Sequence, residues 1–208
     1  QSDLSRLDPE FVKSLHEALA EGLIVPAGKM YRFTHDRIQQ AVYSLIADKD
    51  RNHAHLTIGR LLLANIPEDK REAHLFDIVN QWNWGKDIIT DAGEKELLAG
   101  LNLEAGRKAK QSSAFKAALE YFETGIALLK DDPWNVQYEL CRNLHTEATE
   151  AAYLNGDFAT MDKYYPIVLK NTRNLLEKVK PYEIRILAYK AENKLLDAIK
   201  TGLELLKQ

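Results

Sequence analysis

The chain has 208 residues, of which 45% are apolar and 28% are charged, and its 28 basic and 31 acidic residues give a net charge of -3. This balance is that of an ordinary soluble protein with one large domain or two small ones. It provides no general attraction to nucleic acid or to an anionic membrane, and no apolar run approaches the roughly 20 residues of a membrane span. We therefore expect a cytoplasmic protein with no membrane segment, and nucleic acid is disfavoured as a partner.

The single cysteine, Cys141, cannot form an internal disulfide, which fits a reducing compartment. It lies between Leu140 and Leu144 in a helical pattern, so we expect a small core residue rather than a nucleophile. The chain does not begin with methionine, and its first residues already lead into a helix start. From this we expect a piece of a longer protein.

Residues 1–50 predict a helix, a hairpin and a second helix. Asp8-Pro9-Glu10 is a helix start and Gly22 ends that helix. Short extended runs at residues 23–25 and 31–33 flank a predicted turn at residues 26–29. Thr34 is placed to cap the second helix, whose expected apolar face is Ile38, Ala41, Val42, Leu45 and Ile46. This order indicates a winged-helix-like segment that lacks its first helix.

Residues 51–96 predict a connecting helical segment. Its first helix carries apolar residues between 56 and 63 and is stopped by Pro67, and a second, over residues 73–82, ends near Gly85. Trp84, beside that glycine, is the tryptophan we expect to be partly exposed.

Residues 97–208 predict six helices without an intervening strand pattern. Asp132-Pro133 and Asp157 are expected helix caps, and Pro181 is expected to open the fifth helix. The second helices of three pairs can be aligned, and steps of three, four and three residues place each set on one face. The sets are Phe115, Ala118, Phe122 and Gly125; then Phe158, Met161, Tyr165 and Val168; then Leu195, Ala198, Gly202 and Leu205.

This pattern resembles the tetratricopeptide repeat. Gly106, Ala118, Phe122 and Gly125 match its small and aromatic signature positions, and Gly156-Asp157-Phe158 is similar to its turn between helices. Ala118, Met161 and Ala198 are 43 and 37 residues apart rather than about 34. The expected fold is thus mainly α, with a winged-helix-like N-terminal part that has a short β-hairpin, followed by an α-α superhelix of degenerate tetratricopeptide-like pairs. Tyr165, Ala198 and Gly202 are further signature positions of these pairs.

A more specific resemblance begins at residues 31–45, Tyr-Arg-Phe-Thr-His-Asp-Arg-Ile-Gln-Gln-Ala-Val-Tyr-Ser-Leu, and continues through residues 56–63, 101–109 and 182–185. These segments are similar to large bacterial hybrid sensor histidine kinases and regulators built on a signal-transduction ATPase with numerous domains (STAND). The resemblance implies an ATPase core before this region and sensor or kinase domains after it. The candidate contacts with other domains or partners are His35, Asp36, Arg37, Gln40 and Trp84.

No catalytic, cofactor or metal site is predicted. Gly22 to Gly28-Lys29 has five intervening residues instead of the four of a phosphate loop. His53 and His55 diverge on a helix, which favours a surface position over a metal site. The run Arg107, Lys108 and Lys110 is expected to be a solvated helix face.

The leading hypothesis is therefore a non-catalytic interaction and regulatory module that relays state between an ATPase core and output domains through protein contacts. The alternative is a fragment of a winged-helix DNA-binding transcriptional regulator. Against it, the candidate recognition helix at residues 36–45 has Arg37 as its one cation, which is poor for phosphate contact. The oligomeric state is left open.

Overall fold

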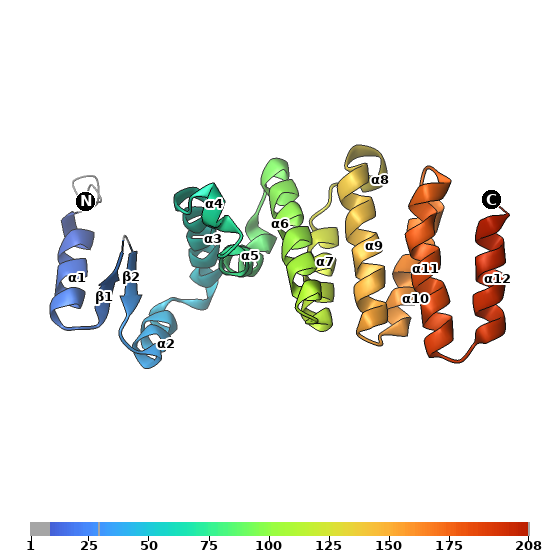
Figure 1. Cartoon of the computed structure of the whole chain (residues 1–208). Coiled ribbons are helices and arrows are strands. Elements are labelled where there is room, and N and C mark those ends of the chain that lie inside the picture. Colours follow the sequence, from blue (N-terminus) through green and yellow to red (C-terminus); the bar gives the residue numbers. More distant parts are fainter. Residues whose placement is uncertain (1–8, 29, 208) are drawn as a thin grey trace. The chain divides into compact units, whose positions relative to one another are not determined.

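The computed structural model describes residues 9–28 and 30–207, so the predicted cap Asp8 and the turn residue Lys29 lie outside the described residues. The chain divides into two compact units, residues 1–51 and 52–208. The described residues are mainly helical and include a small antiparallel hairpin, which confirms the mainly α character and the short hairpin that were predicted (Figure 1).

The first unit contains α1 (Pro9–Ala20), β1 (Ile24–Ala27), β2 (Met30–Phe33) and α2 (Asp36–Leu45). Gly22 adopts a φ of +67°, and the N–H of Leu23 donates to the carbonyl of Ala18 at 2.9 Å, so the helix ends in a left-handed turn as expected. Ile24 pairs with Phe33 in the hairpin. The strand β1 includes residues 26 and 27, so the turn is shorter than predicted.

Two expectations for α2 are wrong. The Thr34 hydroxyl does not cap the helix: it donates to the carbonyl oxygens of Gly22 (2.8 Å) and Leu23 (3.2 Å), and His35 is the N-cap residue. The expected apolar face is also not buried, since no residue of α2 is buried and Leu45 is 84% exposed. Among the described residues of the first unit, none buries this face.

The second unit begins within α3 (Asp48–Asn65) and continues through α4 (Glu68–Arg71), α5 (Leu75–Trp84) and the short 3-10 helix η2 (Lys86–Ile88). Pro67 follows α3 and precedes α4, a single turn that was not predicted. Acidic residues at its start and basic residues at its end complement the helix dipole. Gly85 ends α5 as predicted, and its N–H donates to the carbonyl of Trp82 at 3.0 Å.

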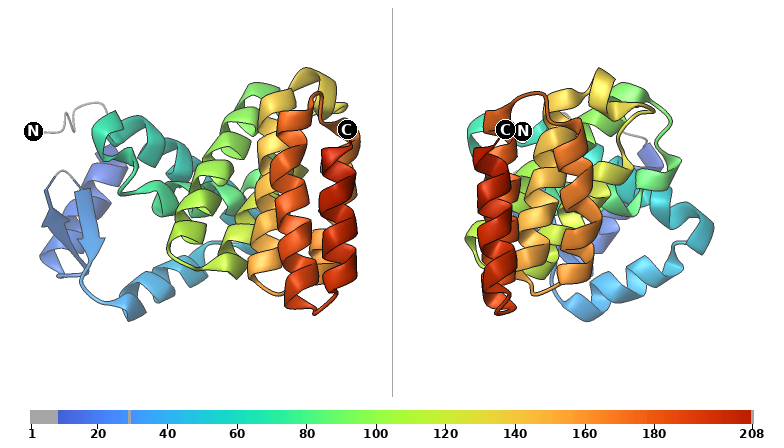
Figure 2. Two further views of the ribbon diagram at one scale, coloured as in Figure 1. Left: turned by 45° about the vertical axis from the view of Figure 1, so that its right-hand side comes forward. Right: turned by 90° about the vertical axis from the view of Figure 1, so that its right-hand side faces the viewer.

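The rest of the second unit is an array of α6 (Ala92–Gln111), α7 (Phe115–Ala127), α8 (Pro133–Val136), α9 (Tyr138–Leu154), α10 (Phe158–Asn171), α11 (Leu175–Ala191) and α12 (Leu195–Leu206). The pairs α6–α7, α9–α10 and α11–α12 each pack together, α9 packs on α7, and α11 packs on α10. The first helices α6, α9 and α11 also contact one another in order, so they form one row beside the second helices (Figures 1 and 2).

Two helix starts in this array differ from prediction. Asp132 has a left-handed φ of +53° and makes no side-chain cap; it precedes the four-residue helix α8, and the longer α9 begins separately at Tyr138. Pro181 lies inside α11 rather than at its start, because the Asn174 side chain accepts the N–H of Glu177 and caps the helix earlier. By contrast, Asp157 caps α10 as expected, accepting the N–H of Thr160 at 3.0 Å.

Close helix contact in the array depends on two glycines. A Cβ atom on Gly106 would lie 2.3 Å from the ring of Phe122, and one on Gly125 would lie 2.6 Å from Leu144. Without these side chains, α6 can approach α7 and α7 can approach α9. Phe122 and Leu144 are fully buried and lie in the main hydrophobic core.

The other aligned repeat positions differ in how deeply they are buried. The small or medium residues Ala118, Met161, Val168 and Ala198 are buried, whereas Phe158 and Gly202 are only partly buried. In α10 the fully buried aromatic is Tyr164, and the predicted Tyr165 is half-buried. Gly156 has a φ of +74°, in the left-handed region that favours glycine, at the turn between α9 and α10.

Candidate interaction surfaces

The contact residues predicted in the first unit lie together at the start of α2. His35, Asp36, Arg37 and Gln40 are all exposed. Asp36 lies in the first helical turn, where a carboxylate interacts favourably with the helix dipole. Their exposure leaves them available to a partner.

Trp84, the predicted contact residue of the second unit, is 64% exposed at the end of α5. Its ring stacks on His55 with centroids 5.6 Å apart, and His55 Nδ1 lies 2.7 Å from the side-chain oxygen of Gln81. The indole is therefore both accessible and held in place, a combination found in anchor residues of interfaces.

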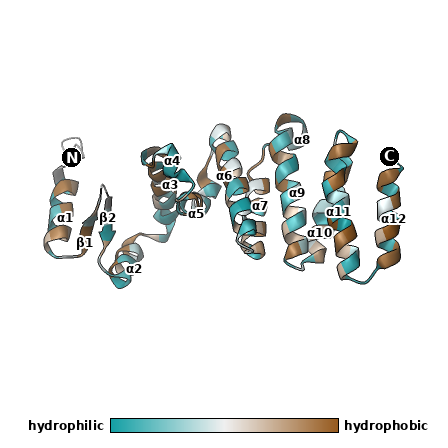
Figure 3. Cartoon of the chain, in the orientation of Figure 1, coloured by the Kyte–Doolittle hydropathy of each residue, from teal (hydrophilic) through white to brown (hydrophobic). Residues whose placement is uncertain are grey.

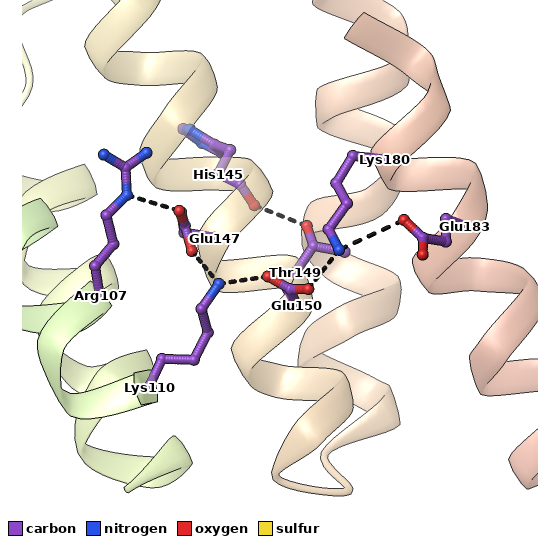
Figure 4. Close-up of polar contacts among 8 residues, drawn as sticks. All are labelled: Arg107, Lys110, His145, Glu147, Thr149, Glu150, Lys180 and Glu183. Atoms are coloured by element: carbon purple, nitrogen blue, oxygen red, sulfur yellow. Dashed lines mark hydrogen bonds and ion pairs between the residues drawn. The ribbon is translucent and has the colours of Figure 1, made fainter. Parts of the chain in front are cut away.

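A ladder of alternating charges crosses α6, α9 and α11 (Figure 4). The Arg107 Nε atom donates to Glu147 Oε1 at 2.7 Å, and the Lys110 ammonium donates to Glu147 Oε2 at 2.5 Å and also to Glu150. Lys180 lies 2.6 Å from Glu150 Oε1. The ladder continues to Glu183, whose carboxylate is 3.5 Å from the Lys180 ammonium. We call these six residues the charge ladder.

The protonation behaviour of the charge ladder follows from its burial and its pairing. Partial burial lowers the pKa of Lys110, but the hydrogen bonds to Glu147 and Glu150 outweigh that effect and leave the pKa raised. Burial raises the pKa of Glu150, and its hydrogen bonds to Lys110 and Lys180 more than reverse this, so the pKa is lowered. Both groups are therefore held in their charged forms at neutral pH.

The prediction of a solvated basic run at 107–110 is wrong. Arg107 and Lys110 pair with carboxylates of α9, and Lys108 donates to the backbone carbonyl of Glu72 at 2.5 Å. The sequence contained a signal for this, since Arg107 and Lys110 are three residues apart, as are Glu147 and Glu150. Such spacing puts each pair on one helix face, and adjacent helices with opposite charges can then join.

A groove of about 890 Å³ lies between α3–α5 and α6 in the second unit. Its apolar lining includes Leu63 and Leu101. The Arg71 guanidinium donates to the carbonyl oxygens of Leu63 and Ile66 at 3.3 Å each. Exposed carboxylates also line the groove, so its charge is mixed. They are Glu68, Glu72 and Glu104.

The buried cysteine does not form a catalytic pair. Cys141 Sγ is 3.5 Å from His145 Nδ1, but that nitrogen is also 2.8 Å from the Cys141 carbonyl oxygen, an arrangement in which Nδ1 carries the proton and donates it. The nitrogen that faces the sulfur then cannot accept the thiol proton. Burial raises the pKa of the Cys141 thiol to about 12 and lowers the pKa of His145. The prediction that Cys141 is a core residue is confirmed, since it is fully buried.

Two further properties bear on the kind of site present. Across residues 9–28 and 30–207, no three His, Cys, Asp or Glu side chains gather closely enough to hold a metal ion. A search of the same residues for a helix both long and apolar enough to cross a membrane finds none. The surfaces described above are an exposed aromatic, a groove and a charge ladder on stacked helices.

Comparison with known proteins shows a similarity to one region of a signalling protein. The chain is 30% identical over 202 residues to the hybrid signal transduction histidine kinase G of Dictyostelium discoideum, and the match covers 86% of this chain. The chain spans about 6% of the length of that relative. No protein-family model and no solved structure matches the chain. The similarity supports a region of a signal-transduction protein.

Proposed function

We propose that the chain is a non-catalytic protein-interaction and regulatory module that relays state between an ATPase core and the output domains of a larger cytoplasmic signalling protein. The observation that carries this proposal is that the charged side chains of the array pair with one another between helices. The charge ladder joins α6, α9 and α11 to one another instead of converging on a reactive centre.

The arrangement of the helices supports a degenerate tetratricopeptide-like superhelix. Three helix pairs stack in order, and first helices contact first helices along one row. The contact of Gly106 with Phe122 supports the same reading, since a small residue opposite an aromatic is part of the repeat signature. Such arrays present a continuous surface for protein partners.

The first unit supports a winged-helix-like connection to an ATPase. Its order is a helix, a two-stranded hairpin and a helix, and its predicted contact residues are exposed at the start of α2. The relative is a hybrid histidine kinase from Dictyostelium. A signalling context is therefore supported, whereas the bacterial STAND-type architecture rests on the resemblance that begins at residues 31–45 and continues through residues 56–63, 101–109 and 182–185.

The test uses the larger protein with the array locally disrupted. Gly106→Leu forces a side chain into the buried ring of Phe122, whereas Gly100→Leu places the same side chain on the same helix where the Cβ atom meets nothing within 4 Å. We expect Gly106→Leu to change the autophosphorylation rate of the full protein at least several-fold, and Gly100→Leu to leave it within about twofold.

ATP hydrolysis by the 208-residue chain alone is measured in parallel, and we expect none above a buffer control. Equal autophosphorylation rates for the two glycine variants would contradict the relay. ATP turnover by the isolated chain would contradict a non-catalytic module.

A further inference from the structure

The helix α12 exposes an apolar seam on the side opposite its partner. Ala198 and Thr201 are buried, and α12 packs on α11. The large apolar residues on the other side are exposed by half or more, and Figure 3 shows hydrophobic colour recurring along the helix. They are Leu195, Leu196, Ile199, Leu203 and Leu206.

The spacing within this seam is that of a helix-packing surface. Leu196, Ile199, Leu203 and Leu206 follow one another by three, four and three residues, the a and d positions of two heptads. Single exposed leucines need no explanation, but a contiguous row of this size marks an interaction site. The extremes of the row, Leu196 and Leu206, are 74% and 83% exposed.

The array itself shows what covers such a surface elsewhere. The second helix α7 is covered by α9, the first helix of the following pair, and α10 is likewise covered by α11. α12 is the second helix of the third pair, and its leucine seam lies on the side away from α11. A helix is therefore the shape of occupant that the seam fits.

The charges beside the seam restrict that occupant. Lys200 and Lys207 fall at the two e positions of the heptads and are exposed, and the opposite edge carries Leu195 and Gly202. The Lys200 ammonium also lies 3.7 Å from Asp197 of the same helix, an exposed pair that leaves it accessible to an incoming carboxylate. A second copy of α12 packed antiparallel would bring these lysines together, which is unfavourable. An incoming helix with acidic residues along that edge would be complementary.

The size of the seam indicates that the occupant is tethered. Together, its five residues expose an area equal to that of roughly three whole side chains. This area is well below the roughly 800 Å² that each partner buries in a stable complex between separate proteins. A helix in the same polypeptide needs less surface, because a linker supplies an effective concentration near the millimolar range.

We propose that α12 is covered by another amphipathic helix of the polypeptide to which this chain belongs, with leucine-like residues at a and d and acidic residues facing Lys200 and Lys207. This rests on the proposed function, in which the chain is one part of a larger signalling protein. The seam is then an internal joint by which the array is attached to a further helical element.

The experiment compares amide hydrogen exchange in α12 between the 208-residue chain and the full protein. We expect exchange across residues 199–206 to be at least tenfold slower in the full protein. Ile199→Glu, at 60% exposure, should abolish that difference, whereas Val136→Glu on α8, at 62% exposure, should preserve it. The double variant Lys200→Glu/Lys207→Glu should reduce the protection several-fold.

Any other outcome contradicts part or all of the proposal that a helix of the same polypeptide covers α12. Equal exchange in the chain and the full protein shows that no helix covers α12. Protection that grows with the concentration of the chain alone identifies a second copy as the occupant. If Lys200→Glu/Lys207→Glu leaves the protection unchanged, the incoming helix does not have acidic residues facing these lysines. Autophosphorylation of the two Gly variants tests the relay separately, so the joint can fail while the relay stands.

Discussion

Gly100 and Gly106 lie on the same helix, α6, but differ in their surroundings, and this makes them a matched pair for testing the packing of the array. A Cβ atom on Gly106 would lie 2.3, 2.6 and 2.7 Å from three ring carbons of Phe122. At Gly100 it would meet nothing within 4 Å. The change Gly→Ala therefore adds one methyl group to open space in one case and to a buried aromatic contact in the other.

The expected effects have opposite signs. Alanine is favoured over glycine in a helix interior by about 1 kcal/mol, so Gly100→Ala should raise the free energy of unfolding by roughly 0.5–1 kcal/mol. Overpacking typically costs about 1–3 kcal/mol, and the Phe122 ring that the new methyl group would meet is fully buried. Gly106→Ala should therefore lower the free energy of unfolding by up to about 2 kcal/mol despite the helix-propensity gain.

The assay is urea unfolding followed by far-ultraviolet circular dichroism and by tryptophan fluorescence, because coincident curves are needed before free energies are compared. At about 2–4 °C per kcal/mol for a unit of this size, the two variants should also differ in Tm by several degrees. If Gly106→Ala is as stable as Gly100→Ala, α6 and α7 do not pack as closely as described, and the reasoning is refuted.

Four further predictions test other features. Because burial raises the pKa of the Cys141 thiol to about 12, a disulfide reagent at pH 8 should label it far more slowly in the native protein than in urea, and fast native labelling would contradict this. Because burial lowers the pKa of His145, the unfolded chain binds more protons below the usual histidine pKa of about 6.5. The free energy of unfolding should then fall between pH 7.5 and 5.5, and should fall less in His145→Gln; equal pH profiles would exclude this role. Asp157→Ala should cost about 1 kcal/mol in urea unfolding and Asp157→Asn much less, since asparagine retains the cap to Thr160; equal losses would count against the cap. Finally, a gel-shift assay with duplex DNA at low salt should show no retardation, as expected for a helix whose one cation is Arg37, and a salt-sensitive shift would favour the alternative DNA-binding function.

Helix boundaries could be predicted where one local signal acted alone. Asp157 follows a turn glycine and caps α10, and Gly22 and Gly85 end their helices as expected. Prediction failed where two signals competed. Pro181 is a favourable first-turn residue, but Asn174 offers a side-chain cap seven residues earlier, and α11 begins directly after it.

The candidate surfaces were harder to predict because they depend on contacts between helices. The expected face of α2 had the right spacing, yet helical periodicity does not show whether a neighbour exists to cover it. The charge ladder joins helices through residues 30 to 40 positions apart, such as Lys110 with Glu150, and the groove is lined by residues as far apart as Arg60 and Gln111. Local spacing indicates which residues share a face, but the packing of the helices decides which faces meet.

The position of Glu150 gives the charge ladder a physical connection to the proposed relay. In a stacked array each helix pair interacts mainly with its immediate neighbours, so a disturbance passes from one pair to the next. Glu150, on α9, shares its carboxylate between Lys110 of α6 and Lys180 of α11, and these two helices belong to the first and third pairs. Partly buried hydrogen-bond networks strengthen and weaken together, because each bond polarises the next. The carboxylate of Glu150 is therefore a direct polar link between the first and third pairs, and it is the contact that the proposed relay would use.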